Sequence, residues 1–415
     1  MRVQVEPLWG LCRYHGYLGQ LQEAERFAKQ AFEIAESAGD QWFVGLIYCT
    51  MGTSFTLSGK YENAREWLTN GATIFHNVRD SFGSAAINCA LLYNEWYNGS
   101  QASAIELTPS LFGELKQGNY DFLLTRASHL GFQDPQPFIP ILLEAYKQGI
   151  EADWIQVLLK GLDLSHTDYH PGYGLSIQTL GKFEVWRGNN LTNARDWQRE
   201  KARQLFQFFI NNRGKWFSRD QLTDRLWPNL DLEASNQNLK VALNALNRAL
   251  EPGREPGQNP FFIQRYDALY GLNPAACVKL DVDDFIQLTS SSEPEDLQAA
   301  LELYQGDYLS DGETETWSFE TRERMREVYL GTAHKLAEYH LNNAHYDETM
   351  RICHAILSID HCNEPAFRLL MRSHAFRGNQ SGVHSVFQRC TTLLQEDLDV
   401  SPSNETINLY HELTK

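Results

Sequence analysis

The sequence lacks several features that would place it in well-defined protein classes. None of its seven cysteines forms a Cys-x-x-Cys pair and their number is odd, so neither a zinc ribbon nor a complete disulfide framework is indicated. No run of apolar residues reaches the length of a membrane span, and the N-terminal stretch MRVQVEPLWG is too polar for a signal peptide. These absences predict a cytoplasmic protein with reduced thiols and no membrane partner.

Positive charge is also scarce, and it is unevenly distributed. The formal net charge is -17, yet residues 175–275 hold 14 lysines and arginines against 10 acidic residues, a balance of +4 that leaves -21 for the rest. Acidic flanks weaken non-specific attachment to phosphate. A nucleic-acid-binding segment in this chain therefore needs base contacts or a partner protein, and its affinity should fall steeply with salt.

The length and the local patterns predict a multidomain, mainly α protein. A chain of 415 residues with 42% hydrophobic residues can fill two or three cores. We expect two helical-repeat domains of tetratricopeptide-like type flanking an α+β winged helix-turn-helix domain. The predicted boundaries are helical repeats at 1–165, a linker at 166–174, the winged helix at 175–275 and a second helical domain at 280–415.

An internal repeat supports the helical assignment at both ends. The glycine of LGQLQEAERFAKQA, Gly19, is followed 40 residues later by Gly59 in SGKYENAREWL, and a looser echo surrounds Gly118. Near the C-terminus, Ala344 and Gly378 are 34 residues apart, which is one tetratricopeptide period. Ordinary helix packing explains the alanines of these segments equally well.

The central segment shows the element order of a winged helix. After Pro171, Gly172 and Gly174, the stretch LSIQTLGKFEVW predicts short strands, and REKARQLFQFFINNRG predicts a first helix. A second helix follows in SRDQLTDRLWP, with Ser218 as its N-cap and Pro228 beyond its end. A third helix is expected near 233–250, and FFIQRYDALYGLN then forms the two strands of a wing.

The third helix has two chemically different faces. Five apolar residues fall within about 60° of one direction and should pack: Leu239, Ala242, Leu243, Leu246 and Leu250. The opposite face carries Gln237, Lys240, Val241, Asn244 and Arg248. These residue types pair with adenine, guanine, phosphate and the thymine methyl group, so we interpret them as DNA base-reading residues. The less favoured alternative is an exposed polar face used for protein contacts.

Two groups of segments resemble one known family. The first comprises LSIQTLGKFEV, REKARQLFQFF and RLWP; the second comprises NEPAFRLLMRSHAFRGNQ and LLQEDLDVSPSNETINLYHEL. They resemble the bacterial regulators that join an OmpR-type winged helix to a bacterial transcriptional activation domain, as in antibiotic-pathway regulators. The resemblance covers residues 175–415. It departs from the family pattern at Gly271, which follows Tyr270 in the wing, and at Asp399, where glycine is common.

This resemblance implies further DNA contacts. Arg199, Lys201 and Arg203 match the family's basic cluster and could hold phosphate at a helix N-terminus. A solvated basic face balanced by Glu200 is nearly as good an interpretation of the same residues. Arg265 of the wing could enter an adjacent minor groove.

The resemblance also implies function and partners. It predicts a sequence-specific transcriptional regulator, of the activator class, that binds double-stranded DNA at direct repeats and contacts RNA polymerase or a second copy of itself. Larger members carry a nucleotide-binding switch domain, which raises the possibility that this chain is part of a longer regulator. The competing interpretation is a protein-interaction scaffold whose winged helix is a docking module.

Signals of catalysis or metal binding are weak. GTSFTLSGKY, at 52–61, has the wrong glycine spacing for a phosphate loop. His166, Asp168 and His170 have ligand-like spacing but fall in the expected linker, where nothing would fix their geometry. Cys353, His354, His361 and Cys362 are explained as helix-packing and helix-end residues. We therefore expect no enzyme activity, no catalytic residues, no metal and no cofactor.

Overall fold

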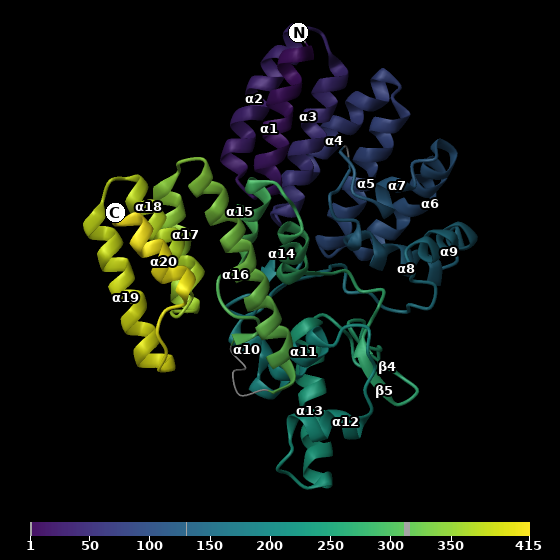
Figure 1. Cartoon of the computed structure of the whole chain (residues 1–415). Coiled ribbons are helices and arrows are strands. Elements are labelled where there is room, and N and C mark those ends of the chain that lie inside the picture. Colours follow the sequence, from purple (N-terminus) through teal and green to yellow (C-terminus); the bar gives the residue numbers. More distant parts are fainter. Residues whose placement is uncertain (1, 130, 311–315) are drawn as a thin grey trace. The chain divides into compact units, whose positions relative to one another are not determined.

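The computed structural model describes residues 2–129, 131–310 and 316–415, and it is mainly helical with a small amount of sheet (Figure 1). The chain forms two compact units. The first comprises residues up to Gly174 together with 251–264 and 273–276, and the second comprises 175–250, 265–272 and 277–415. The predicted fold class, helical repeats combined with a small α+β region, is confirmed. The domain boundaries placed from the sequence stay a prediction.

The first unit is an array of helical hairpins in which consecutive helices from α1 to α6 pack on one another. Its main helices are α1 (Arg2–Tyr17), α2 (Leu21–Ser37), α3 (Gln41–Leu57), α4 (Tyr61–Val78), α5 (Ser81–Tyr97) and α6 (Gln101–Gly118). Three shorter helices follow: α7 (Phe122–Thr125), α8 (Ile139–Lys147) and α9 (Ala152–Gly161). Helix α3 is buried on almost all sides, so it forms the centre of this array.

The 40-residue repeat is confirmed, with one correction. Gly19, Gly59 and Gly99 have φ of 72°, 71° and 88° and lie two residues before α2, α4 and α6. Such left-handed turns suit glycine because it has no Cβ. The echo predicted at Gly118 is wrong, because this glycine is the last residue of α6 and the short α7 follows. The repeat at Gly99 was not recognised from the sequence, because the helix after it begins with Gln101, whereas the helix after Gly59 begins with the aromatic Tyr61.

Residues predicted to form a linker are packed within the first unit. His170 is buried, and its ring lies edge-on to Phe261 with centroids 4.3 Å apart. Its Nδ1 accepts a hydrogen bond from the Gly172 amide at 3.0 Å. Burial lowers the pKa of His170 to about 3, so the ring is neutral.

A buried carboxyl group holds the 251–264 segment of the same unit. One oxygen of Glu251 accepts hydrogen bonds from the Phe261 and Phe262 amides at 2.9 and 2.8 Å. Arg254 lies 3.3 Å from the other oxygen. Burial outweighs these contacts and raises the pKa of Glu251 to about 7.

The second unit begins with a four-stranded sheet in the order β3-β2-β1-β6. Its strands are β1 (Leu175–Gln178), β2 (Glu184–Arg187), β3 (Asn190–Leu191) and β6 (Val278–Leu280). The first three form the expected antiparallel meander, whereas β6 pairs in parallel with β1 and was not predicted. A strand of three residues is too short for its alternation to be recognised in a sequence.

The helices of the winged region lie where the sequence predicts them. They are α10 (Ala194–Trp197), α11 (Glu200–Asn211), α12 (Arg219–Leu226) and α13 (Leu232–Leu250), of which only the short α10 was missed. Ser218 caps α12 in a capping box with Gln221, as expected. The wing is a two-stranded sheet of β4 (Ile263–Tyr266) and β5 (Leu269–Leu272).

The chain after β6 is helical. Its elements are α14 (Asp281–Thr289), α15 (Pro294–Leu303), α16 (Phe319–Asn342), α17 (Tyr346–Ile359), α18 (Glu364–Phe376), α19 (Gln380–Leu398) and α20 (Asn404–Leu413). Ala344 and Gly378 both adopt positive φ before α17 and α19, which confirms the 34-residue spacing. Asp399 has φ of 54° after α19, a left-handed conformation that glycine adopts more readily than other residues. Within the described residues, no helix is both long and apolar enough to cross a bilayer.

The buried Glu251 carboxyl group makes the first unit pH-sensitive. Between about pH 4.5 and 7 the folded unit holds a proton that the unfolded chain lacks, so this contribution to the free energy of unfolding falls as pH rises. Glu251→Gln keeps an acceptor for both amides without the ionisation. We expect the stability difference, wild type minus variant, to fall across this window in urea titrations monitored by fluorescence.

The buried His170 has the opposite effect on the pH dependence of stability. Its contribution to the free energy of unfolding is lost as pH falls from about 6.5 towards 3. It is present in both proteins, so it cancels in the difference. Glu33→Gln, at an exposed carboxylate of α2, serves as the control and should give a flat difference. A flat difference for Glu251→Gln as well would contradict the prediction.

Candidate nucleic-acid interface

One face of α13 is available for contact. Gln237, Lys240, Asn244 and Arg248 are exposed and Val241 is half-buried. Their spacing places them along one side of the helix over about three turns. The predicted opposite face is confirmed as core, since its five residues are at most 9% exposed: Leu239, Ala242, Leu243, Leu246 and Leu250.

Both ends of α13 are anchored by polar contacts. At the N-terminal end, Asp231 accepts a hydrogen bond from the Ala234 amide at 2.8 Å. At the C-terminal end, the Arg187 guanidinium donates to the Ala249 carbonyl at 3.0 Å and reaches Asp196 at 3.2 Å. These bonds satisfy backbone groups that a helix end leaves unpaired. The exposed face is therefore presented by a fixed helix.

The charged groups on this face are not neutralised locally. Lys240 and Arg248 form no ion pair with any residue that the structure describes. By contrast, Arg213 is bound to Asp283 through two hydrogen bonds of 2.7 Å. A cation without a carboxylate partner keeps its capacity for an external anion or base edge.

The predicted phosphate cluster consists of three unequal residues. Arg199 is exposed at the N-cap position of α11. The Lys201 ammonium lies 6.0 Å from the Trp227 ring centre, and the Arg203 guanidinium lies 5.4 Å from that of Phe183. Arg203 also lies 3.5 Å from Glu200. Arg199 is thus the cation best placed for phosphate, and the role of all three stays a prediction.

The wing presents an aromatic residue that the sequence analysis missed. Asp267 and Ala268 have positive φ and turn β4 into β5. Arg265 is exposed, with its guanidinium 5.8 Å from the Tyr270 ring centre. Beside it, Tyr266 is 69% exposed. A large exposed aromatic next to an arginine at a hairpin turn was the signal that could have identified it.

The wing carries glycine at position 271 for a steric reason. A Cβ on this residue would lie 2.9 Å from the Trp216 ring and 3.1 Å from the Lys215 carbonyl oxygen. The strand after Tyr270 therefore passes too close to Trp216 for a side chain. Trp197 and Trp227 are buried, consistent with a structural role.

The winged region is joined to the following helices by backbone contacts. Residues 304–310 lie along the turn after β1, where Leu180 bridges to Tyr308. The Gly181 amide donates to the Asp307 carbonyl at 3.1 Å, and the Leu309 amide donates to the Thr179 carbonyl at 2.8 Å. Ser310 adds a hydrogen bond to the Gly181 carbonyl at 2.9 Å. These contacts bind 304–310 to the turn between β1 and β2.

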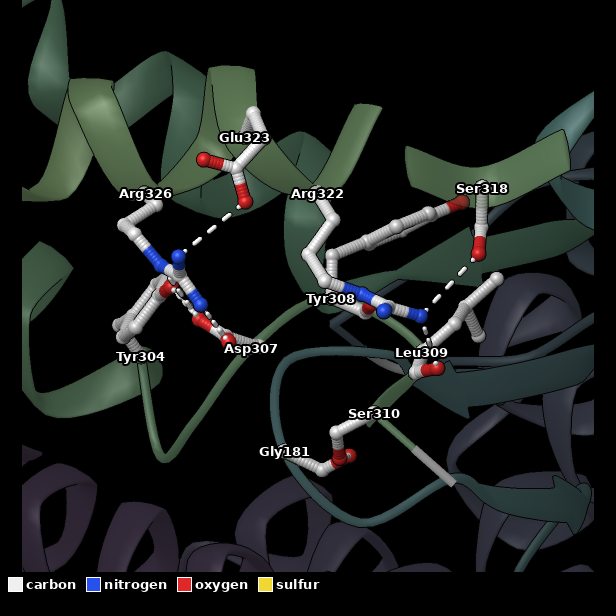
Figure 2. Close-up of polar contacts among 10 residues, drawn as sticks. All are labelled: Gly181, Tyr304, Asp307, Tyr308, Leu309, Ser310, Ser318, Arg322, Glu323 and Arg326. Atoms are coloured by element: carbon white, nitrogen blue, oxygen red, sulfur yellow. Dashed lines mark hydrogen bonds and ion pairs between the residues drawn. The ribbon is translucent and has the colours of Figure 1, made fainter. Parts of the chain in front are cut away.

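Two arginines of α16 hold the same segment from the other side (Figure 2). Arg322 is buried and donates to the carbonyls of Tyr308 and Leu309, both at 3.0 Å, and to the Ser318 hydroxyl at 3.1 Å. One turn along, Arg326 pairs with Asp307. Arg322 therefore links α16 to the segment that is bound to the sheet.

The comparisons with known proteins address the C-terminal helices most directly. Residues 289–414 match the family model described as the bacterial transcriptional activator domain. These helices therefore match a family of transcriptional activators. This confirms the corresponding part of the resemblance. No curated protein matches the chain.

The solved structures that are similar to the chain include the following two. One is Mycobacterium tuberculosis EmbR in complex with a low-affinity phosphopeptide, with 17% identity and a TM-score of 0.49 over 58% of this chain and 65% of that chain. The chain thus spans less than two thirds of the length of EmbR. The other is the TPR2AB domain of yeast Sti1 in its pHSP90 complex, with 10% identity and a TM-score of 0.26 over 100% of both chains.

The structure also locates the weaker candidates. Among the described residues, no group of three or more histidine, cysteine or acidic side chains could hold a metal ion. His166 and Asp168 are exposed, whereas His170 is buried. Cys353 is buried in α17, and Cys362 lies in the turn before α18.

Replacing Arg322 should destabilise the second unit. Arg322→Met keeps much of the apolar stem but leaves the carbonyls of Tyr308 and Leu309 without this donor, which should cost about 3 kcal/mol of unfolding free energy. Urea titration measures the change. Arg324→Met, on an exposed position of the same helix, should change the free energy by less than about 0.5 kcal/mol. Equal effects of the two substitutions would contradict the role of Arg322.

Proposed function

We propose that this chain is a sequence-specific DNA-binding transcriptional regulator of the activator class. The observation that carries the proposal is the exposed polar face of α13 on a helix whose other face is core. The activator-domain match at 289–414 supports a role in transcription. In this proposal residues 175–275 act as an OmpR-type winged helix and α13 enters the major groove.

Each side chain on the exposed face has a specific role in this proposal. Gln237 and Asn244 offer paired amide donors and acceptors to adenine, and Arg248 offers two parallel donors to guanine. Val241 presents a methyl surface for thymine, and Lys240 reaches guanine or phosphate. The mixture of amide, cation and apolar group provides discrimination that charge alone does not.

The flanking contacts would position the domain. Arg199 and the neighbouring Lys201 and Arg203 lie at the start of α11, where unpaired amides and the helix dipole favour phosphate. Arg265 would enter a minor groove, and Tyr266 would lie against the sugar-phosphate backbone beside it. Two copies would bind direct repeats in tandem, and the C-terminal helices would contact RNA polymerase.

The base-reading assignment is tested by a double substitution. A selection from random DNA first identifies the preferred sequence, and titrations then compare wild type with Asn244→Ala/Arg248→Ala. We expect each lost base contact to cost about 1–3 kcal/mol on the preferred sequence and far less on unrelated DNA. The matched control is Arg324→Ala/Asn342→Ala, at exposed positions of α16. Preserved selectivity in the double variant would rule out this assignment.

Salt dependence distinguishes a DNA reader from a protein-docking scaffold. A reader should lose affinity steeply as salt rises, and Arg199→Ala should weaken binding to all sequences equally and reduce the logarithmic salt slope by about 1. Asp220→Ala, an exposed change on α12 that removes negative charge, should not reduce the slope. A DNA affinity without salt dependence would favour the scaffold.

A further inference from the structure

The first unit contains a pocket that the proposed DNA reading does not use. Its volume is about 470 Å³, within the range of small-molecule sites. Its lining comes from the end of α5, the start of α6, helix α8 and the segments 168–173 and 252–258, all in the first unit. The walls are thus built from parts of the chain more than 150 residues apart.

Aromatic rings form one part of the wall. Trp96, Tyr97, Tyr169 and Tyr173 all line the pocket. The Tyr97 hydroxyl donates to the Pro137 carbonyl at 3.0 Å, which fixes the ring. Burial raises the pKa of Tyr97 well above its usual value, so this wall stays uncharged at neutral pH. Aromatic faces carry negative electrostatic potential and attract cations.

The charged groups in the lining are predominantly acidic. Glu144, Asp168 and Glu255 contribute carboxylates, and Lys147 contributes the one ammonium among the residues that line this pocket. Lys147 is half-exposed, with its ammonium 4.0 Å from the Glu144 carboxylate. Three carboxylates against one ammonium favour a positively charged occupant.

His170 adds an unused donor. Because its Nδ1 accepts the Gly172 amide proton, the neutral ring carries its own proton on Nε2. This Nε2 is buried and makes no hydrogen bond among the described residues. A buried donor without an acceptor is costly. Because this atom has almost no exposed surface, an occupant of the pocket reaches it only if neighbouring side chains move.

We propose that this pocket binds a small organic cation, an amine or quaternary ammonium ion. The cationic group lies among the aromatic rings and the carboxylates. Pro252 and Gly253 of the lining lie two and three residues after α13 ends at Leu250. The occupant therefore contacts the segment that connects α13 to the wing.

Calorimetric titration of the full chain tests this proposal with three cations that each probe the pocket: acetylcholine, carbamoylcholine and phenethylamine. We expect saturable binding of at least one at millimolar or lower concentration. The neutral isostere of acetylcholine, 3,3-dimethylbutyl acetate, should bind at least about tenfold more weakly because it lacks the charge. No saturable binding of any cation, or equal binding of the isostere, would overturn the proposal.

Charge-neutralising variants identify the site. Glu144→Gln/Asp168→Asn/Glu255→Gln keeps side-chain size, and it should weaken cation binding about tenfold. The matched control is Glu25→Gln/Glu33→Gln/Glu106→Gln, which removes three exposed carboxylates of the same unit outside the pocket. Equal binding by the two triple variants would also overturn the proposal. The measurement contains no DNA, so its outcome is independent of the base-reading assignment.

Discussion

The second unit depends on a polar junction around the turn after β1. Asp281, at the first position of α14, accepts hydrogen bonds from the Thr179 and Leu180 amides and from the Thr179 hydroxyl at 2.6–2.9 Å. Because one carboxylate satisfies three donors from the strand end, the sheet and α14 are fixed to each other. Arg322 completes the junction by binding the segment that pairs with the same turn. Residues 175–250 and the activator-type helices therefore belong to one compact unit.

The parts of this fold that could be predicted are those with a local repeating pattern in the sequence. The apolar face of α13 repeats every three to four residues over about three turns, from Leu239 to Leu250, so both its packing side and its exposed side were identified from the sequence. The Gly19 and Gly59 turns were found because glycine adopts the left-handed conformation of such a turn more readily than other residues, and Gly99 was missed because its context lacks an aromatic partner. Strand β6 and the pairing of 304–310 depend on long-range backbone contacts that leave no local pattern.

The candidate sites also differ in how well the sequence predicts them. The α13 face lies on one helix, so spacing alone brings its members together. Tyr266 was missed because a single exposed aromatic in a short strand has no periodic neighbours. The pocket of the first unit draws on segments from Trp96 to Gln258, and no spacing rule could join them. His170 shows the difference most clearly, since a histidine between Tyr169 and Pro171 in a turn-rich stretch is typical of a solvated connection, yet it is buried and packs against Phe261.

The path of the chain limits how this protein can be divided. It passes between the two units five times, and the stretch after α13 belongs to the unit that contains the helical hairpins. Phe261 and Phe262 are almost fully buried there, with His170 and Tyr173 against their rings. A shortened protein that started at residue 175 would expose both phenylalanines to water and leave Glu251 with altered surroundings. The hairpin array is thus a structural component of the central region, and removing it by truncation or proteolysis would not release an intact smaller protein.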